Sequence, residues 1–422
     1  MTLVIVTLFA ALTRFWNLAT PKGYVFDEVY YVDGAKDYLK YGVEIDKSAP
    51  EFIVHPPIGK WIISLGIKLF GDNEFGWRFM GALLGTLSIT LIYLIANKLF
   101  NSHFLATSAA ALMALDGLHL VLSRTALLDI YLMFFVLAAF FSFLSEKYWW
   151  TGIALGFAIG TKWSGIYYLL TFLAIVIYFE VRNVSRIKII LQRITQFFMA
   201  PALIYIFSWS GWLISKRGWD RQWADERGGF YSFIPSPIRS LWHYHFEMLN
   251  FHTSLTQAHS YSANPWSWLI LGRPTSFYYQ SPKNCGSASC AQEVLALGTP
   301  ILWWLGSAAL IVTFGYLISR REKSAGFILA GVAAGYLPWF FFQKRTVFSF
   351  YAIVFEPFIV LAIIYCFAKL LEDPASFKAR KQALIGVQIA IALCFLYFFP
   401  IFVATVTSYD DWHARMWFTS WI

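Results

Sequence analysis

The chain has 422 residues and a mass of 48.4 kDa; 58% of the residues are hydrophobic and only 14% are charged. Soluble domains carry roughly 25% charged residues, so this composition excludes a disordered chain, a coiled coil and an ordinary soluble enzyme. A net charge of +9 would suggest a nucleic-acid partner in a soluble protein, but basic loops in a membrane protein set topology and contact lipid phosphates. We therefore expect membrane lipids, and no nucleic acid, as partners.

The apolar residues form continuous runs that match the roughly 20 residues a helix needs to cross a bilayer. The strands of a β-barrel would instead alternate in hydrophobicity, so the sequence predicts an all-α polytopic membrane protein with about eleven transmembrane helices. The stretch 149–180 is either two short spans broken at 161–165 or one long kinked span. The expected helices lie near residues 2–19, 77–99, 104–122, 127–145, 149–161, 165–180, 195–214, 299–318, 324–342, 346–370 and 384–407.

The short loops between these helices differ in charge, which predicts the orientation of the chain. One set carries thirteen Lys and Arg, whereas the opposite set carries four, namely Arg124, Lys162, Lys344 and Arg345. The more basic loops are expected in the cytoplasm, which places the N-terminus inside and the C-terminus outside. The thirteen are Lys98, Lys147, Arg182, Arg186, Lys188, Arg193, Arg320, Arg321, Lys323, Lys369, Lys378, Arg380 and Lys381.

Two long loops, 20–76 and 215–298, are expected outside, folded onto a single membrane domain that spans 1–422. In the second loop, Ser236 and Pro237 are typical of a helix start, with the serine as cap. The amphipathic, Trp-rich sequence that follows is expected to lie along the membrane surface. Cys285 and Cys290 are spaced to close a disulfide, which persists outside the cytoplasm; half of a metal site is the alternative.

An acidic pair, Asp27 and Glu28, follows the first span in an aromatic setting. Neighbouring side chains on a helix diverge by about 100°, so one carboxylate is a candidate general base while the other orients a substrate or a cation. Stabilisation of a helix start by the acidic pair is the alternative reading. Further along the same loop, a double proline presents His55 and Lys60 at the interface, unless it is a plain turn before a helix.

Cations at outer helix ends, Arg78, Arg124, Lys162 and Arg345, indicate an anionic ligand such as a lipid-linked phosphate. Ordinary ion pairing is the alternative, and Arg124 with Asp129 is a candidate structural pair. Histidines 243, 245, 252 and 259 do not have the spacing of a metal site, and we interpret them as hydrogen-bonding residues at the interface. The sequence contains no phosphate-binding loop and no serine-hydrolase motif.

Taken in order, these motifs resemble the protein O-mannosyltransferase family over nearly the whole chain. The matching segments are Phe26–Tyr31, His55–Trp61, Gly76–Phe79, Asp116–Gly117, Ser123–Thr125, Leu128–Asp129, Lys162–Gly165, His259–Trp268, Arg273–Pro274, the Cys285 and Cys290 pair, Pro338–Trp339, Arg345–Tyr351 and Trp417–Trp421. The resemblance implies a GT-C glycosyltransferase fold. It also implies transfer of mannose from a polyprenyl phosphate to Ser or Thr hydroxyls of proteins being translocated, at the Sec translocon.

By resemblance, Asp27 is the catalytic aspartate and Glu28 its partner at the acceptor. Arg78 and Lys162 match residues associated with activity or the donor phosphate, and we extend that role to Arg345. The resemblance assigns no individual role to four further motif positions, which are Arg124, Asp129, His55 and Lys60.

Eukaryotic members carry a β-trefoil in the second long loop, for which 215–298 has no room. This difference indicates the bacterial, actinobacterial type, in the plasma membrane with its active site outside. No cofactor or metal is expected to be required, although Asp27 and Glu28 could hold a divalent cation. The alternatives are a GT-C enzyme that glycosylates a lipid or cell-wall glycan and, from another class, a transporter or lipid flippase. The sequence does not predict an oligomeric state.

Overall fold

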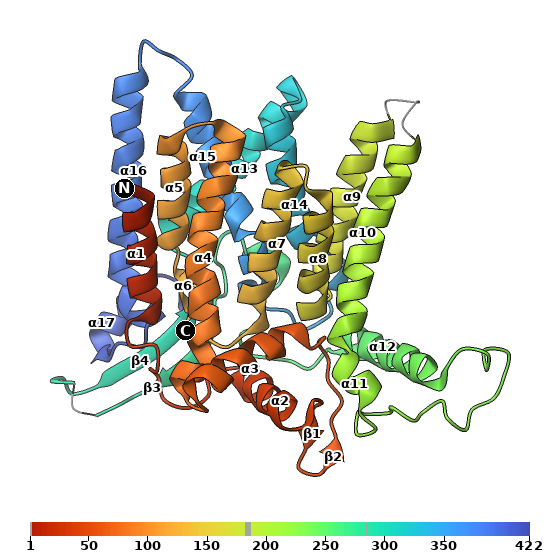
Figure 1. The fold of residues 1–422 in the computed structure, drawn as a ribbon. Coiled ribbons are helices and arrows are strands. Elements are labelled where there is room, and N and C mark those ends of the chain that lie inside the picture. Colours follow the sequence, from red (N-terminus) through yellow and green to blue (C-terminus); the bar gives the residue numbers. More distant parts are fainter. Residues whose placement is uncertain (1, 182–186, 284) are drawn as a thin grey trace.

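The computed structural model describes residues 2–181, 187–283 and 285–422. In this part of the chain, apolar helices stand side by side and form a broad bundle (Figure 1). Their bounds are α1 Thr2–Phe15, α4 Glu74–Phe100, α5 His103–Ala114, α6 Gly117–Ser123, α7 Leu128–Leu144, α8 Tyr148–Thr161, α9 Gly165–Val181, α10 Ile187–Ser208, α13 Pro300–Arg320, α14 Lys323–Tyr336, α15 Glu356–Leu370 and α16 Phe377–Phe402.

Within the described residues, the length and composition of five helices allow them to cross a membrane. α5 and α6 pass the same test together as a sixth span, bent by 64°. α1, α7 and α9 supply shorter apolar helices. Each of the eleven predicted segments coincides with a helix or a broken helix, which confirms the polytopic fold. The stretch 149–180 is two helices, α8 and α9. The five helices that are long and apolar enough to cross a membrane are Glu74–Phe100, Lys188–Ser208, Pro300–Arg320, Lys323–Phe342 and Phe377–Phe402.

The bend between α5 and α6 is fixed by Asp116. Its side chain accepts hydrogen bonds from the backbone N–H of His119, at the start of α6, and from the N–H of Thr299, just before α13. It also accepts one from Trp303 Nε1 on α13. Because one buried carboxylate serves two helix starts, the segment 104–122 is broken rather than straight.

Close packing of α8 against α10 sets one wall of the bundle. A Cβ atom added at Gly152 or Gly156 of α8 would overlap the α10 backbone at Gln196 and Pro201. Only glycine permits this approach. The wall matters because α9 and α10 flank the cavity described below.

The two long loops gather at one end of the bundle, the lower end in Figure 1. The first contains α2 (Glu28–Tyr41) and α3 (Ile58–Phe70); the second follows α11 (Ser210–Ile214) and contains α12 (Ser236–Ser254). α12 is amphipathic as predicted, since Tyr244 is buried while Trp242 is 80% exposed. Ser236 is its first helical residue and Pro235 takes the cap position, so the serine does not cap the helix as predicted.

The described residues of these loops also contain two small antiparallel sheets, which the sequence analysis did not predict. β1 (Ile45–Asp46) pairs with β2 (Ala49–Pro50). In the second sheet the order is β3 (Thr275–Gln280), β4 (Cys290–Ala296) and β5 (Thr407–Ser408), with Thr275 opposite Ala296 and Cys290 opposite Ser408. This sheet attaches the C-terminal segment, with α17 (Tyr409–His413), to the second loop. The 3₁₀ helices are Pro265–Ser267, Leu337–Phe342, Ser349–Val354 and Thr419–Trp421.

The disulfide prediction is confirmed: Cys285 and Cys290 are joined beside the start of β4, which excludes the metal half-site. Cys366 and Cys394 are free thiols on the apolar helices α15 and α16.

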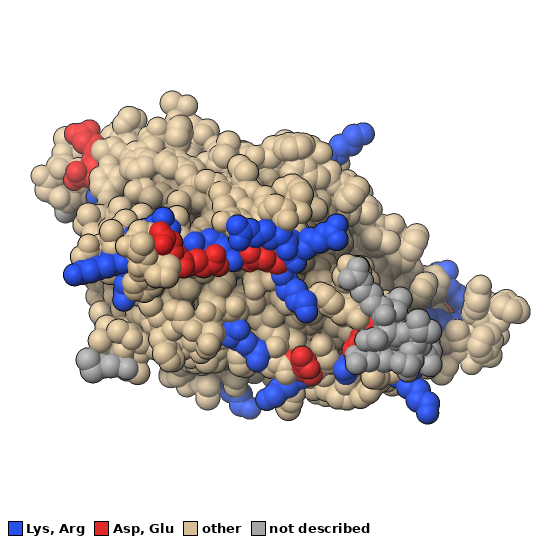
Figure 2. Space-filling view, turned by 90° about the horizontal axis from the view of Figure 1, so that it is seen from above, with Lys and Arg blue, Asp and Glu red and all other residues tan. Residues whose placement is uncertain are grey.

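The opposite end of the bundle carries the short connections and their basic residues. Figure 2 looks onto this end, where Lys and Arg side chains cross the face in a band with fewer acidic ones. Basic residues at this end lie in the connections from α7 to α8 and from α13 to α14, and in the ends of α15 and α16 that face each other across their connection. Arg182 and Arg186 from the predicted basic set lie outside the described residues. The basic connections and the long loops therefore lie at opposite ends, as the orientation argument requires.

Candidate active site

Asp27 lies at the N-cap of α2, directly after a strained residue. Phe26 has a φ of +51°, a left-handed conformation that is costly for a bulky side chain. The Phe26 ring is held by Phe277 of β3, stacked at 4.8 Å, and by edge contacts to Phe348 and Phe350. These contacts compensate the strain and fix the position of the following carboxylate.

The surroundings of Asp27 suit a general base. Burial raises the pKa of Asp27 to about 6, while the nearby Lys162 ammonium and a hydrogen bond from Tyr31 act in the opposite direction. Asp129 adds a second negative charge nearby, which also raises this pKa. A carboxylate with a pKa close to the working pH is both deprotonated and basic enough to accept a proton in catalysis.

Lys162 forms a buried ion pair with Asp129. Its Nζ lies 2.9 and 3.0 Å from the two carboxylate oxygens and 4.3 Å from the centre of the Tyr351 ring. Lys162 sits in the break between α8 and α9, and Asp129 in the first turn of α7. The predicted pairing of Asp129 with Arg124 is therefore wrong, since Asp129 pairs with Lys162. The charge of Lys162 also acts on Asp27.

Arg78 and Glu28 form a fully buried pair whose hydrogen-bonding capacity is used inside the protein. Arg78 donates to both carboxylate oxygens of Glu28 at 2.8 Å and to the carbonyls of Leu18, Pro21 and Gly23. Five acceptors match the five N–H donors of a guanidinium. Glu28 also accepts the backbone N–H groups of Val25 and Ala126.

Both side chains of this pair are 0% exposed. Glu28 does not face an acceptor, and Arg78 has no donor left for a phosphate, in contrast to the sequence prediction. The pair instead ties the loop that carries Asp27 to α4.

Arg124 and Lys60 are also structural. Arg124 donates to four carbonyls at the C-terminal end of α1, those of Thr13, Arg14, Trp16 and Asn17. Such an arrangement satisfies the orphan carbonyls of a helix end. Lys60 pairs with Glu44 inside the first loop and is only 5% exposed, so it is not presented at the interface as predicted.

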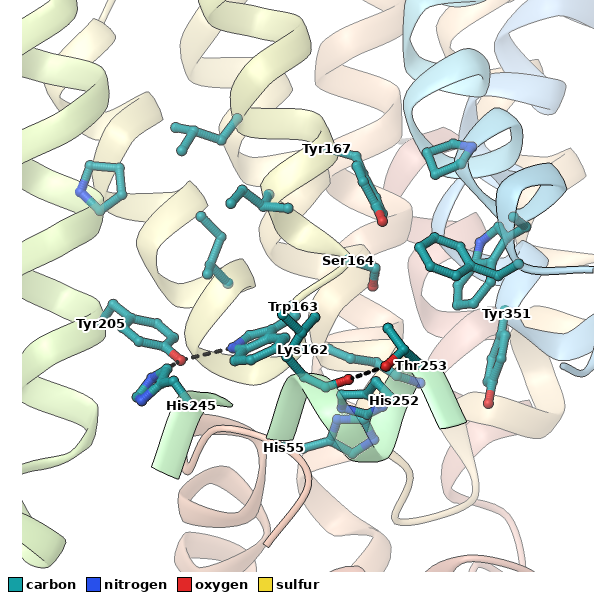
Figure 3. Close-up of a pocket in the computed structure, with 18 of the residues that line it drawn as sticks. His55, Lys162, Trp163, Ser164, Tyr167, Tyr205, His245, His252, Thr253 and Tyr351 are labelled. Carbon is teal, nitrogen blue, oxygen red and sulfur yellow. Dashed lines mark hydrogen bonds between the residues drawn. The ribbon is translucent and has the colours of Figure 1, made fainter. Parts of the chain in front are cut away.

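A cavity of about 530 Å³ opens beside Lys162. Most of its wall is apolar and comes from α9, α10 and the 3₁₀ helix after α14, with Ile166, Phe198 and Trp339 among the lining residues. Its polar end is formed by the residues that Figure 3 shows converging: His55 below His252, with Lys162 and Tyr351 beside them. Arg345 lines the same end.

Two buried polar atoms at this end lack a partner among the described residues: Nε of Arg345 and Nδ1 of His55. A buried unpaired polar group is costly, so this end of the cavity has hydrogen-bonding capacity that the described residues do not use. Lys162, Arg345 and His55, which the sequence analysis selected from separate motifs, therefore all line this cavity.

Sequence reasoning missed three further residues of this region. Tyr31 contacts Asp27, and Tyr351 lies under the Lys162 ammonium. Tyr205 accepts a hydrogen bond from Trp163 and bonds His245 at 2.7 Å (Figure 3). Tyr31 and Tyr351 each end a motif that carried the family resemblance, whereas Tyr205 has no sequence signal that distinguishes it from other tyrosines of an aromatic-rich chain.

The histidines form hydrogen bonds, as predicted. His243 bonds Asp220, His245 bonds Tyr205, His252 bonds the carbonyl of Val54, and His259 accepts the N–H of Tyr261. Among residues 2–181, 187–283 and 285–422, no group of three His, Cys, Asp or Glu side chains is arranged to hold a metal ion.

Comparisons with known proteins decide the family. Residues 4–210 match the family "Dolichyl-phosphate-mannose-protein mannosyltransferase" and residues 237–421 match "C-terminal four TMM region of protein-O-mannosyltransferase". The polyprenol-phosphate-mannose–protein mannosyltransferase of Mycobacterium tuberculosis is 32% identical over 99% of this chain and 91% of its own length. The chain belongs to the protein O-mannosyltransferase family. A second bacterial mannosyltransferase, from Corynebacterium glutamicum, is 29% identical over 100% of the chain and 93% of its own length.

Solved structures show that the fold of this protein O-mannosyltransferase is the GT-C fold. The S. cerevisiae Pmt1–Pmt2 complex bound to the sugar donor matches with a TM-score of 0.82 at 16% identity, over 100% of this chain and 92% of the yeast chain. ArnT from Cupriavidus metallidurans bound to undecaprenyl phosphate matches with a TM-score of 0.58 at 17% identity, over 94% of this chain and 70% of ArnT. This protein O-mannosyltransferase is a polytopic membrane glycosyltransferase.

Proposed function

We propose that this chain transfers mannose from polyprenyl phosphate mannose to Ser or Thr hydroxyls of protein substrates. The observation that carries the proposal is the cavity lined by Lys162, whose positive charge also acts on Asp27. Its apolar wall suits a polyprenyl chain, and its lining includes the two cations Lys162 and Arg345. Arginine binds phosphate oxygens with directed N–H groups. The relatives' names give the same chemistry for those proteins.

Asp27 is the proposed base. Its carboxylate takes the proton of the Ser or Thr hydroxyl while that oxygen attacks the anomeric carbon of mannose. The bond between this carbon and the phosphate oxygen breaks, and the electron pair leaves with the polyprenyl phosphate. Direct displacement inverts the configuration of the anomeric carbon.

Arg345 and Lys162 stabilise the leaving phosphate. Charge grows on the phosphate oxygens as the bond breaks, and cations fixed beforehand favour that state. Lys162 donates to both carboxylate oxygens of Asp129, which fixes its ammonium group at the wall of the cavity. Because a phosphate leaves without protonation, the reaction needs no second carboxyl group as acid, unlike the hydrolysis of a glycosidic bond. We propose that no metal or cofactor takes part.

The proposed location is the plasma membrane of a bacterium, with the N-terminus in the cytoplasm. The basic connections at the end seen in Figure 2 then face the cytoplasm, and Asp27 with the long loops faces outside. The protein substrates would be met as they emerge from the Sec translocon. An extended chain presents its hydroxyls before folding buries them.

The test measures donor KM in Arg345→Gln against a matched control, Arg227→Gln. Arg227 is an exposed arginine of the second loop that stacks on Trp223, so its replacement removes the same charge away from the cavity. Loss of a hydrogen bond to a charged group raises donor KM roughly tenfold or more, and the control leaves it unchanged. An unchanged donor KM in Arg345→Gln contradicts the phosphate assignment. Label on lipid rather than on a Ser/Thr-rich peptide would instead indicate a glycolipid acceptor.

A further inference from the structure

His252 joins three segments that are far apart in the sequence. It lies in the last turns of α12, and its Nε2 donates to the carbonyl of Val54 at 2.7 Å. Its Nδ1 lies 3.2 Å from an Nη of Arg345. Its ring also stacks on His55, with centroids 5.3 Å apart. Val54 is the residue before His55, so one side chain touches both groups that bear an unpartnered atom at the polar end of the cavity.

These contacts fix the protonation state of the ring. A carbonyl oxygen only accepts, so the proton must sit on Nε2. An arginine N–H only donates, so Nδ1 must be the bare nitrogen. The neutral ring with its proton on Nε2 satisfies both partners, whereas a protonated ring would point an N–H at a guanidinium. Burial and the charge of Arg345 lower the pKa of His252 to about 4, which is consistent with the neutral form.

The contact leaves Arg345 oriented but not neutralised. Arg345 pairs with an uncharged acceptor rather than a carboxylate among the described residues, in contrast to Arg78, which is paired with Glu28. One edge of the guanidinium is thereby held, while Nε has no partner. An arginine held in this way keeps its full positive charge for an anion in the cavity.

We propose that His252 is a positioning residue of the donor site: it holds Arg345, and through Val54 the neighbouring His55, in the geometry that receives the polyprenyl phosphate. This inference rests on the proposed function, because the ligand is the donor phosphate. His252 itself acts through its neighbours. Its effect should appear in donor binding and should depend on Arg345.

The test uses two replacements of His252 and one control. His252→Phe keeps a ring against His55 and Trp163, which His252 also contacts, but removes both hydrogen bonds. His252→Gln keeps one donor and one acceptor in a side chain that does not titrate. The control, His243→Phe, changes a histidine of the same helix that bonds Asp220 and does not line the cavity. Donor KM, acceptor-peptide KM and thermal stability are measured for each purified protein.

We expect His252→Phe to raise donor KM about tenfold, the effect of one hydrogen bond to a charged group, with acceptor KM unchanged. His252→Gln should recover most of this loss, and His243→Phe should leave donor KM unchanged. The double variant His252→Phe/Arg345→Gln should be less impaired than the product of the two single effects, since the histidine acts in part through the arginine. An unchanged donor KM in His252→Phe, or effects that multiply in the double variant, would overturn the proposal.

Failure of the proposed function gives a different result. If Arg345→Gln leaves donor KM unchanged, the phosphate assignment fails, whatever His252 does. If Arg345→Gln raises donor KM and His252→Phe does not, only the positioning role fails. Binding of polyprenyl phosphate to the purified protein, followed by tryptophan fluorescence, supplies a readout that does not depend on turnover.

Discussion

Replacing Arg78 by alanine distinguishes the structural role found here from the phosphate-binding role that the sequence suggested. The substitution removes five donated hydrogen bonds and leaves the buried carboxylate of Glu28 with only two backbone N–H partners. Breaking a buried ion pair by deleting one partner costs about 3–5 kcal/mol. A loss of this size is a large fraction of a typical folding free energy.

The assay follows thermal unfolding of the detergent-solubilised protein by tryptophan fluorescence, alongside donor KM. We expect Arg78→Ala to lower the unfolding temperature by several degrees, and the fraction that stays folded to keep its donor KM. The control is Lys22→Ala in the same loop, where the lysine side chain is 77% exposed and pairs with Glu74; exposed pairs contribute less than about 1 kcal/mol. Wild-type thermal stability combined with a raised donor KM in Arg78→Ala would refute the reasoning.

Three further predictions address the base, the disulfide and Lys60. Because burial raises the pKa of Asp27 to about 6 and the base must be deprotonated, kcat/KM should level off above that pH and fall about tenfold per unit below it; a break near pH 4 would contradict this. Replacing Cys285 and Cys290 together by serine should lower the free energy of unfolding by about 2 kcal/mol, the stabilisation expected from a disulfide that closes so short a loop. By mass spectrometry, the wild type should weigh two hydrogens less than its reduced form. Lys60→Ala should destabilise the protein by about 3–5 kcal/mol, whereas Lys60→Met with Glu44→Leu should cost less; equal losses would count against a buried pair.

The membrane fold could be predicted because its signal is local. Several apolar runs are long enough to cross a bilayer, and charge differences between short loops separate the two ends. The bend at Asp116 could not be predicted, because it depends on Thr299 and Trp303, more than 180 residues away. The β3–β4–β5 sheet escaped prediction for a similar reason, since β5 comes from the C-terminal segment.

The candidate site shows the same limit for charged residues. Sequence reasoning identified Lys162 and Arg345 as cations near the donor, and both line the cavity. The same reasoning also selected Arg78 and Arg124. In a sequence, a cation at a helix end that binds a ligand cannot be distinguished from one that binds backbone carbonyls. Only the partners decide: Arg78 is saturated by Glu28 and loop carbonyls, whereas Nε of Arg345 has no partner among the described residues.

The most direct test of the account is transfer of radiolabelled mannose from polyprenyl phosphate mannose to a Ser/Thr-rich peptide, with wild type and Asp27→Asn side by side. Asparagine keeps the shape of the side chain but cannot accept the proton. The account predicts label on the peptide with wild type and a loss of at least about a hundredfold with Asp27→Asn, at unchanged thermal stability and with or without a chelator. Turnover by Asp27→Asn close to that of wild type would contradict the central claim that Asp27 is the base.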